Sequence, residues 1–222
     1  MDHFRLHPVL LIVLAAILQP AAVRAGPTDQ VGRQRVVVEV ESSRSTEGTL
    51  TLLETRNGTS RVVLGPVPAH VGRGGVSAAH REGDGTTPIG TFALTSAFGM
   101  KPASGTKLPY AQLKVGDCWI SDVLDRAYNT RVRRTSCASP NENLYRIGMA
   151  GPYRLAVVTA YNTMPIVRGK GSAIFVHVNS IDSAGRARPT SGCVSVSYAV
   201  MKRLVGLLDP AASPTLTVRV KR

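Results

Sequence analysis

The chain is poor in aromatic residues, in cysteine and in long apolar runs. Aromatic side chains make up only 5% of its 222 residues, so it lacks the stacking residues of a groove for single-stranded nucleic acid. Three cysteines are too few for a disulfide scaffold, and their odd number leaves at least one without an internal partner. With 43% hydrophobic residues the composition is that of an ordinary globular protein, and we expect no nucleic-acid partner.

Acidic residues are scarce beside basic ones. There are 14 Asp and Glu against 27 Lys and Arg, which gives a formal net charge of +13. Such an excess favours anionic partners and carries no information about the fold. A local cluster of Arg131, Arg133 and Arg134 can meet carboxylates or anionic polymers, although a solvated face is the default interpretation.

Residues 1–25 are predicted to be a signal peptide. Arg5 lies in the first segment, an apolar run follows at 9–18, and Val23-Arg24-Ala25 precedes the expected cleavage point. The run is far shorter than the ~20 residues that span a bilayer, so we expect cleavage and no stable membrane span. An uncleaved anchor is the alternative. Residues 26–34 then form a short linker, and residues 35–222 a single domain.

Export changes what the cysteines can do. Outside the cytosol, Cys118 and Cys137 can pair and close a loop of about 20 residues, worth roughly 3 kcal/mol in the loop-entropy model. The alternatives are free thiols or a bridge that uses Cys193. We favour the Cys118–Cys137 disulfide, because Cys193 stands in a sequence context that has its own explanation.

Alternating apolar residues predict a mostly β domain. Strands are expected at 35–41, 49–54, 61–64, 91–95, 155–161, 172–179 and 215–220. Asn57-Gly58 between two of them is a strong signal for a tight hairpin. One amphipathic helix is expected at 197–208 with Ser197 as its cap. Residues 99–118 and 128–143 are expected to be irregular.

One strand and one turn contain the residues with reactive chemistry. Alternation places His177 and Asn179 on the same face of their strand. Cys193 follows sixteen residues after His177, in a glycine-containing turn expected to lie directly before the helix. Backbone N–H groups of such a turn, and a helix N-terminus, stabilise a thiolate or an oxyanion, and a neighbouring histidine can take the thiol proton. The alternative is a core histidine and a small buried cysteine.

These residues resemble the L,D-transpeptidase catalytic domain, also called the YkuD domain. That family carries a strand histidine and then a Ser/Thr-His-Gly-Cys motif, here matched by His177 and Thr190-Ser191-Gly192-Cys193. The upstream Thr87-Pro88-Ile89-Gly90-Thr91-Phe92 resembles the second signature of the family, Thr-Pro-x-Gly-x-Phe. The resemblance runs from about Arg35 to the C-terminus. It implies a β-sandwich or barrel of mixed sheets with one main helix after the cysteine.

Three positions depart from the family pattern. Ser191 stands where a histidine is expected, Ser195 where an arginine often follows the cysteine, and Val178 where a glycine often follows the histidine. These departures bear on donor specificity and on the level of activity more than on the nucleophile.

Carried over position by position, the resemblance implies a role for each motif residue. Cys193 is the expected nucleophile, His177 its general base, and the backbone N–H groups of Gly192 and Cys193 the expected oxyanion donors. Ser191, Asn179 and Thr190 are candidates for substrate contact. No cofactor and no metal site are predicted, because no His, Cys and Asp residues have metal-ligand spacing.

Three residues outside the motifs have simpler interpretations. Asp84 is expected to be a turn residue, because it stands between glycines in a loop. His70 and His80 lie near glycine-rich loops and are expected to be solvated.

The activity that the resemblance implies is peptidoglycan cross-linking outside the cytosol, by a secreted, periplasmic or wall-associated enzyme. Cys193 would attack the bond between the L-centre of a diamino acid and a terminal D-residue of a stem peptide. Transfer to the side-chain amine of a second stem gives a 3→3 cross-link, whereas transfer to water makes the same site an L,D-carboxypeptidase. Carbapenem acylation and contact with anionic cell-wall polymers are further expectations.

The competing interpretation is a catalytically idle wall-binding module. Ser191 and Ser195 in place of the family's histidine and arginine motivate it, together with the positive charge of the chain.

Overall fold

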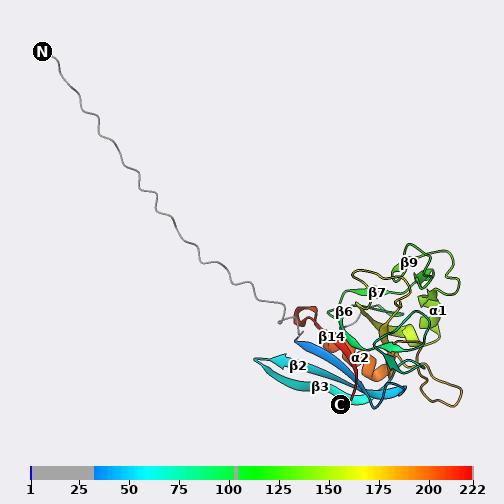
Figure 1. The fold of residues 1–222 in the computed structure, drawn as a ribbon, viewed down its shortest axis with the longest axis horizontal. Coiled ribbons are helices and arrows are strands. Elements are labelled where there is room, and N and C mark those ends of the chain that lie inside the picture. The colour runs from blue at the N-terminus through cyan, green and yellow to red at the C-terminus, as the bar shows by residue number, and fades with distance from the viewer. Residues whose placement is uncertain (2–32, 103–104, 222) are drawn as a thin grey trace. The chain divides into compact units, whose positions relative to one another are not determined.

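The computed structural model describes Met1 and residues 33–102 and 105–221 (Figure 1). The predicted signal peptide beyond Met1, and most of the linker at 26–34, lie outside the described residues. The described residues from 33 onward form one compact unit. No helix in the described part of the chain has both the length and the apolar character that a membrane span requires.

Most regular structure in the described residues is strand. The strands are β1 (Gln34–Val40), β2 (Glu47–Arg56), β3 (Thr59–His70), β4 (Val76–Ser77), β5 (Thr87–Pro88), β6 (Gly90–Gly99), β7 (Tyr110–Gln112), β8 (Asp117–Trp119), β9 (Arg131–Arg133), β10 (Glu142–Asn143), β11 (Leu155–Thr159), β12 (Phe175–Val178), β13 (Val194–Val196) and β14 (Thr215–Val220). The helices are α1 (Leu144–Met149), α2 (Tyr198–Leu207) and two 3₁₀ turns, η2 (Pro152–Arg154) and η3 (Pro210–Ala212).

Eight strands close into a mixed barrel. Their order is β11-β12-β13-β3-β2-β1-β14-β6, and β6 returns to pair with β11. The pairs β1–β14 and β12–β13 are parallel, and the other barrel pairs are antiparallel. Figure 1 shows β14, in red, beside the blue N-terminal strand. The predicted barrel of mixed sheets is therefore confirmed.

The long hairpin of β2 and β3 forms where the sequence predicts it. Asn57 and Gly58 have positive φ angles of 50° and 75°, and Arg56 pairs with Thr59 across the turn. Two consecutive residues with positive φ define the turn whose twist matches antiparallel strands. Strand β3 continues to His70, well beyond the predicted end at residue 64.

The main helix forms where the sequence predicts it, and it packs on the barrel core. The Ser197 hydroxyl accepts a hydrogen bond from the Val200 N–H, so Ser197 caps α2. Met201 and Leu204 on this helix are fully buried in the aliphatic core that the strands enclose. One expectation about this helix is wrong: β13 lies between Cys193 and α2, so the helix N-terminus does not directly follow the cysteine.

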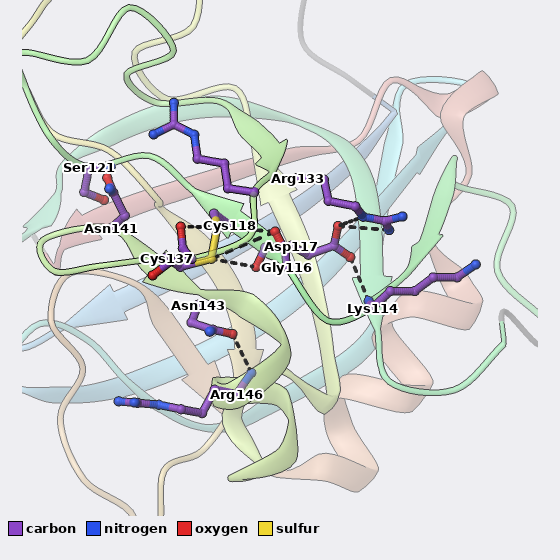
Figure 2. The surroundings of a disulfide bond; sticks show 12 residues. Lys114, Gly116, Asp117, Cys118, Ser121, Arg133, Cys137, Asn141, Asn143 and Arg146 are labelled. Atoms are coloured by element: carbon purple, nitrogen blue, oxygen red, sulfur yellow. Dashed lines mark hydrogen bonds and ion pairs between the residues drawn. A yellow bond between two sulfur atoms is a disulfide. The ribbon is translucent and has the colours of Figure 1, made fainter.

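The segments expected to be irregular hold a second, small sheet. Strand β8 pairs with both β9 and β10, and β10 leads directly into α1, whose cap is Asn143. The predicted disulfide joins Cys118 of β8 to Cys137 (Figure 2). Short strands of two or three residues carry too little alternation to be seen in sequence, which is why they were missed.

The basic cluster lies on this small sheet. Arg131 and Arg133 form ion pairs with Asp117, which is almost fully buried, and Arg134 pairs with Asp125. Figure 2 shows Arg133 reaching toward Asp117 beside the disulfide. These arginines therefore have carboxylate partners within the chain.

Candidate active site

A cavity of about 500 Å³ collects the residues that the motifs single out. Its wall includes His177 from β12 and the turn from Pro189 to Cys193. Glu142 of β10 and Tyr153 of η2 also line it. The structure thus brings the predicted nucleophile and the predicted base to one cavity.

Cys193 is a free thiol buried within an aromatic cluster. It is 6% exposed, and its neighbours in that cluster include Phe175, Trp119 and Tyr153. Its sulfur donates to the Ala173 carbonyl (3.1 Å) and accepts from the Phe175 N–H (3.3 Å). The thiol hydrogen is therefore held by a backbone carbonyl in this state.

His177 is held in one tautomer by the backbone. Its Nδ1 lies 2.7 Å from the Val178 carbonyl oxygen, which can only accept, so Nδ1 carries the hydrogen. In the neutral ring the lone pair is then on Nε2, as a general base requires. The ring packs edge-on against Tyr153, with centroids 5.2 Å apart.

Burial sets the protonation states of this pair. Loss of solvation lowers the pKa of His177 to about 4, opposed by its hydrogen bond to Val178. Loss of solvation, followed by the nearby Glu142 charge, raises the pKa of the Cys193 thiol well above its usual range. The resting pair at neutral pH is therefore thiol and neutral imidazole. The expectation that a turn and a helix end hold a resting thiolate is not met.

Two threonines from different parts of the chain fix the turn that carries the cysteine. The hydroxyls of Thr190 and Thr87 both donate to the Cys193 carbonyl, at 2.6 and 3.3 Å. Thr190 Oγ1 also accepts from the Gly192 N–H (3.1 Å). A Cβ on Gly192 would lie 3.1 Å from the Thr86 carbonyl, so this position favours glycine. One of the two expected oxyanion donors is thus engaged within the turn.

The three predicted substrate contacts have different surroundings. Ser191 lines the cavity, where its hydroxyl accepts from Arg73 Nη1 (3.0 Å). Thr190 also lines the cavity, with its hydroxyl engaged within the turn. Asn179 is not part of the cavity wall, and its buried Oδ1 has no partner among the described residues.

Ser195, at the position of the family arginine, is fully buried on β13. It lies directly between His177 of β12 and His70 of β3 in the strand register. His70 is half-buried beside Glu47, with Nε2 3.9 Å from the carboxylate. The prediction that His70 is solvated does not describe this setting.

The prediction for His80 is wrong, and that for Asp84 is confirmed. His80 is 8% exposed and lines the cavity, with Nδ1 3.1 Å from Asp84 Oδ1. Burial lowers the pKa of His80. Asp84 accepts from the N–H groups of Arg81 and Thr86, as a turn residue does. The His80 ring packs edge-on against Tyr161, which is distant in the sequence, and local composition does not reveal such a tertiary contact.

Sequence reasoning missed the Glu142–Tyr153 pair. The Tyr153 hydroxyl donates to Glu142 Oε2 at 2.6 Å. Loss of solvation raises the pKa of Glu142 to about 7, opposed by this hydrogen bond. Both residues lie in segments without periodicity, eleven positions apart, so no sequence signal links them. Among the described residues, no three His, Cys, Asp or Glu side chains gather in a metal-binding arrangement.

Two solved structures are similar to this chain. One is the helical cell shape determining protein Pgp2 from Campylobacter jejuni, 14% identical, with a TM-score of 0.48 over 88% of this chain and 52% of that one. A point mutant of the same protein is 15% identical, with a TM-score of 0.48 over 86% of this chain and 48% of that one. This chain therefore spans about half the length of those structures. No curated protein matches the chain.

A family model decides the assignment. The model of the L,D-transpeptidase catalytic domain, YkuD, matches residues 34–220, nearly the whole of the described chain. The match includes His177, Cys193 and the Thr87–Phe92 segment. The chain belongs to the L,D-transpeptidase catalytic domain family.

Proposed function

We propose that the protein is an exported cysteine L,D-transpeptidase that forms 3→3 cross-links between peptidoglycan stem peptides. One observation carries this proposal: Cys193 and His177 line the same cavity, and the backbone holds His177 with Nε2 free to accept a proton. Membership of the family supplies the class of reaction.

The first half of the reaction forms an acyl-enzyme. As the sulfur attacks the carbonyl carbon of the L-centred diamino acid, the Cys193 proton passes to His177 Nε2. The backbone N–H group of Cys193 is a proposed donor to the oxyanion, and that of Gly192 joins it once it leaves the Thr190 hydroxyl. The imidazolium then gives its proton to the departing amine, the peptide bond breaks, and the terminal D-residue leaves.

The second half transfers the acyl group. The side-chain amine of a second stem attacks the thioester, His177 takes a proton from that amine, and the thiol is restored. Because burial keeps His177 neutral down to about pH 4, the base is available over the whole neutral range.

Export is supported by the covalent structure. Disulfides persist in oxidising compartments, and the chain holds one between Cys118 and Cys137. The proposal that residues 1–25 direct export agrees with a family whose substrate is the cell wall.

The experiment is product analysis by mass spectrometry. Purified residues 26–222 are incubated with a disaccharide-tetrapeptide, beside a matched Cys193→Ala protein. The proposal predicts a cross-linked dimer that has lost one D-alanine, formed by the wild-type protein and absent with the variant.

The other outcomes identify the competing functions. Tripeptide without dimer would mean that water is the acceptor and that the protein is an L,D-carboxypeptidase. No change with either protein, with Cys193 verified as reduced, would favour the idle wall-binding module, for which the high pKa of the buried thiol provides a reason.

A further inference from the structure

The Glu142–Tyr153 pair places a carboxylate beside the nucleophile. Glu142 comes from β10 and Tyr153 from η2, and both line the cavity that holds Cys193. The Tyr153 hydroxyl donates to Glu142 Oε2 at 2.6 Å, and Tyr153 packs in the same buried cluster as Cys193. The carboxyl group, the phenol and the thiol therefore lie together at one cavity, with the hydroxyl hydrogen held by Glu142.

Among the described residues, no Lys, Arg or His lies within 4.0 Å of the Glu142 carboxylate, although the chain has a large cationic excess. Most carboxylates among the described residues have a Lys, Arg or His within 4.0 Å. Within that part of the chain the exceptions are Glu82, Asp122 and Glu142, and two of these, Glu82 and Glu142, line the cavity. A carboxylate withdrawn from water is costly unless a cation or hydrogen bonds compensate it. Above its pKa of about 7, Glu142 therefore brings to the cavity a negative charge that no cation of the described residues balances and that a cationic ligand can balance.

Other charged and titratable groups face the same space from each neighbouring element. They are Arg73, His80 and Glu82 from the loops before β6, His177 from β12, and Tyr153 from η2. Glu142 is the one whose charge raises the pKa of the Cys193 thiol, second to burial itself. His177 is neutral near pH 7 and does not offset that charge.

The Tyr153 hydroxyl has one hydrogen and two acceptors. While Glu142 is charged and unpaired, the carboxylate is the stronger acceptor and holds that hydrogen. If a cation binds the Glu142 carboxylate, that carboxylate becomes a weaker hydrogen-bond acceptor. The Tyr153 hydroxyl can then rotate and donate its hydrogen to the Cys193 thiolate. Both effects of a bound cation, the cancelled charge and the released hydrogen bond, favour ionisation of Cys193.

We propose that Glu142 binds the side-chain ammonium group of the substrate's diamino acid, and that this ammonium switches Tyr153 from Glu142 to the Cys193 thiolate. The inference rests on the proposed function, since it names the substrate group that the same cavity recognises. Ionisation moves the thiol proton to His177 Nε2, so no external acid or base is consumed. In the free protein the Glu142 charge adds to burial in keeping Cys193 protonated, which suppresses reaction with other electrophiles.

The first test reads the thiol without any turnover. Iodoacetamide alkylation of Cys193 is timed at pH 7.5 by intact mass. Glu142→Gln should alkylate faster than wild type, about tenfold for each unit by which the thiol pKa falls. Tyr153→Phe should alkylate no faster than wild type, because it keeps the charge and loses the donor. Asp122→Asn is the matched control: the Asp122 carboxylate also has no cation within 4.0 Å among the described residues but does not line the cavity, so the alkylation rate should stay near that of wild type.

The second test reads the ligand. Calorimetric binding of a stem tripeptide with a free side-chain amine is compared with binding of its N-acetylated form. Wild type should prefer the free amine by at least tenfold, and Glu142→Gln should lose that preference, with melting temperatures showing that both proteins are folded. An unchanged preference in Glu142→Gln, or an alkylation rate equal to that of wild type, would overturn the proposal. Because neither readout needs cross-linking, failure of the transpeptidase proposal alone would leave both results intact.

Discussion

The barrel interior and the cavity wall differ in the types of residue that form them. The barrel core is aliphatic, with residues such as Val36, Leu52 and Leu216 fully buried. The cavity wall is rich in polar and titratable side chains and touches an aromatic cluster in which Phe98, Trp119 and Tyr153 pack edge-on around Phe175. Tyr153 and Cys193 belong to that cluster and line the cavity.

The difference separates stability from chemistry. Aliphatic burial stabilises the fold without changing any protonation state. In the cavity, loss of solvation shifts the pKa of His177, Glu142 and Cys193, each toward its neutral form. The free energy gained by burial in the barrel therefore offsets the cost of burying ionisable groups at the cavity. Four predictions test this separation of stability from chemistry.

The largest effect is expected on activity, from the nucleophile. Cys193→Ala should lower turnover on the order of 10³-fold or more, because the variant lacks the proposed nucleophile. Its melting temperature should stay close to that of wild type, since the change is small. A carbapenem should add its mass to wild type and not to this variant. Substantial turnover by Cys193→Ala would move the chemistry elsewhere.

A barrel substitution should do the reverse. Leu52→Ala removes a fully buried side chain from the aliphatic core and should lower the free energy of unfolding by about 2–5 kcal/mol. Denaturant titration measures this loss. Turnover per folded molecule should remain near that of wild type, and a large fall in it would mean that the two regions are not separable.

The disulfide should affect both regions, unequally. Replacing Cys118 and Cys137 by Ala should cost roughly 3 kcal/mol through the entropy of the unfolded chain. Because β8 pairs with β10, which carries Glu142, the cavity should loosen as well. Hydrogen exchange of β8 and β10, compared with exchange of β1 and β2, measures this, and equal loss of protection in both pairs would contradict it.

The smallest effect is a pH dependence in which two cavity groups oppose each other. His177, with its pKa lowered from 6.5 to about 4, stabilises the fold less as the pH falls through that window. Glu142, with its pKa raised from 4.5 to about 7, stabilises it less as the pH rises through its own window. Between pH 4.5 and 6.5 the two slopes should nearly cancel in wild type. Glu142→Gln should expose the His177 slope, a gain of about 1.4 kcal/mol per pH unit on raising the pH.

The two regions also differ in how much of them could be predicted from sequence. Long strands with alternating valines, the Asn57-Gly58 turn and the Ser197-capped helix follow local rules, and all of them form. The sequence also predicts that the motif residues His177 and Cys193 lie close together, because the short segment between them connects two neighbouring strands, β12 and β13.

The rest of the site depends on tertiary structure. Glu142 of β10 meets Tyr153 of η2, and His80 is buried against Tyr161, which is distant in the sequence. No period or propensity reports such contacts, because they are fixed by packing and by the disulfide rather than by local backbone preference.

The central claim, that Cys193 in this cavity accepts an acyl group with His177 as its base, is tested most directly by trapping the intermediate. Wild type, His177→Ala and Cys193→Ala are mixed with the disaccharide-tetrapeptide, quenched in acid within seconds and measured as intact proteins. We predict an adduct equal to the stem without its terminal D-alanine, mapped to the Cys193 peptide of wild type, greatly slowed in His177→Ala and absent from Cys193→Ala. An adduct on another residue, or products released by Cys193→Ala, would contradict the account.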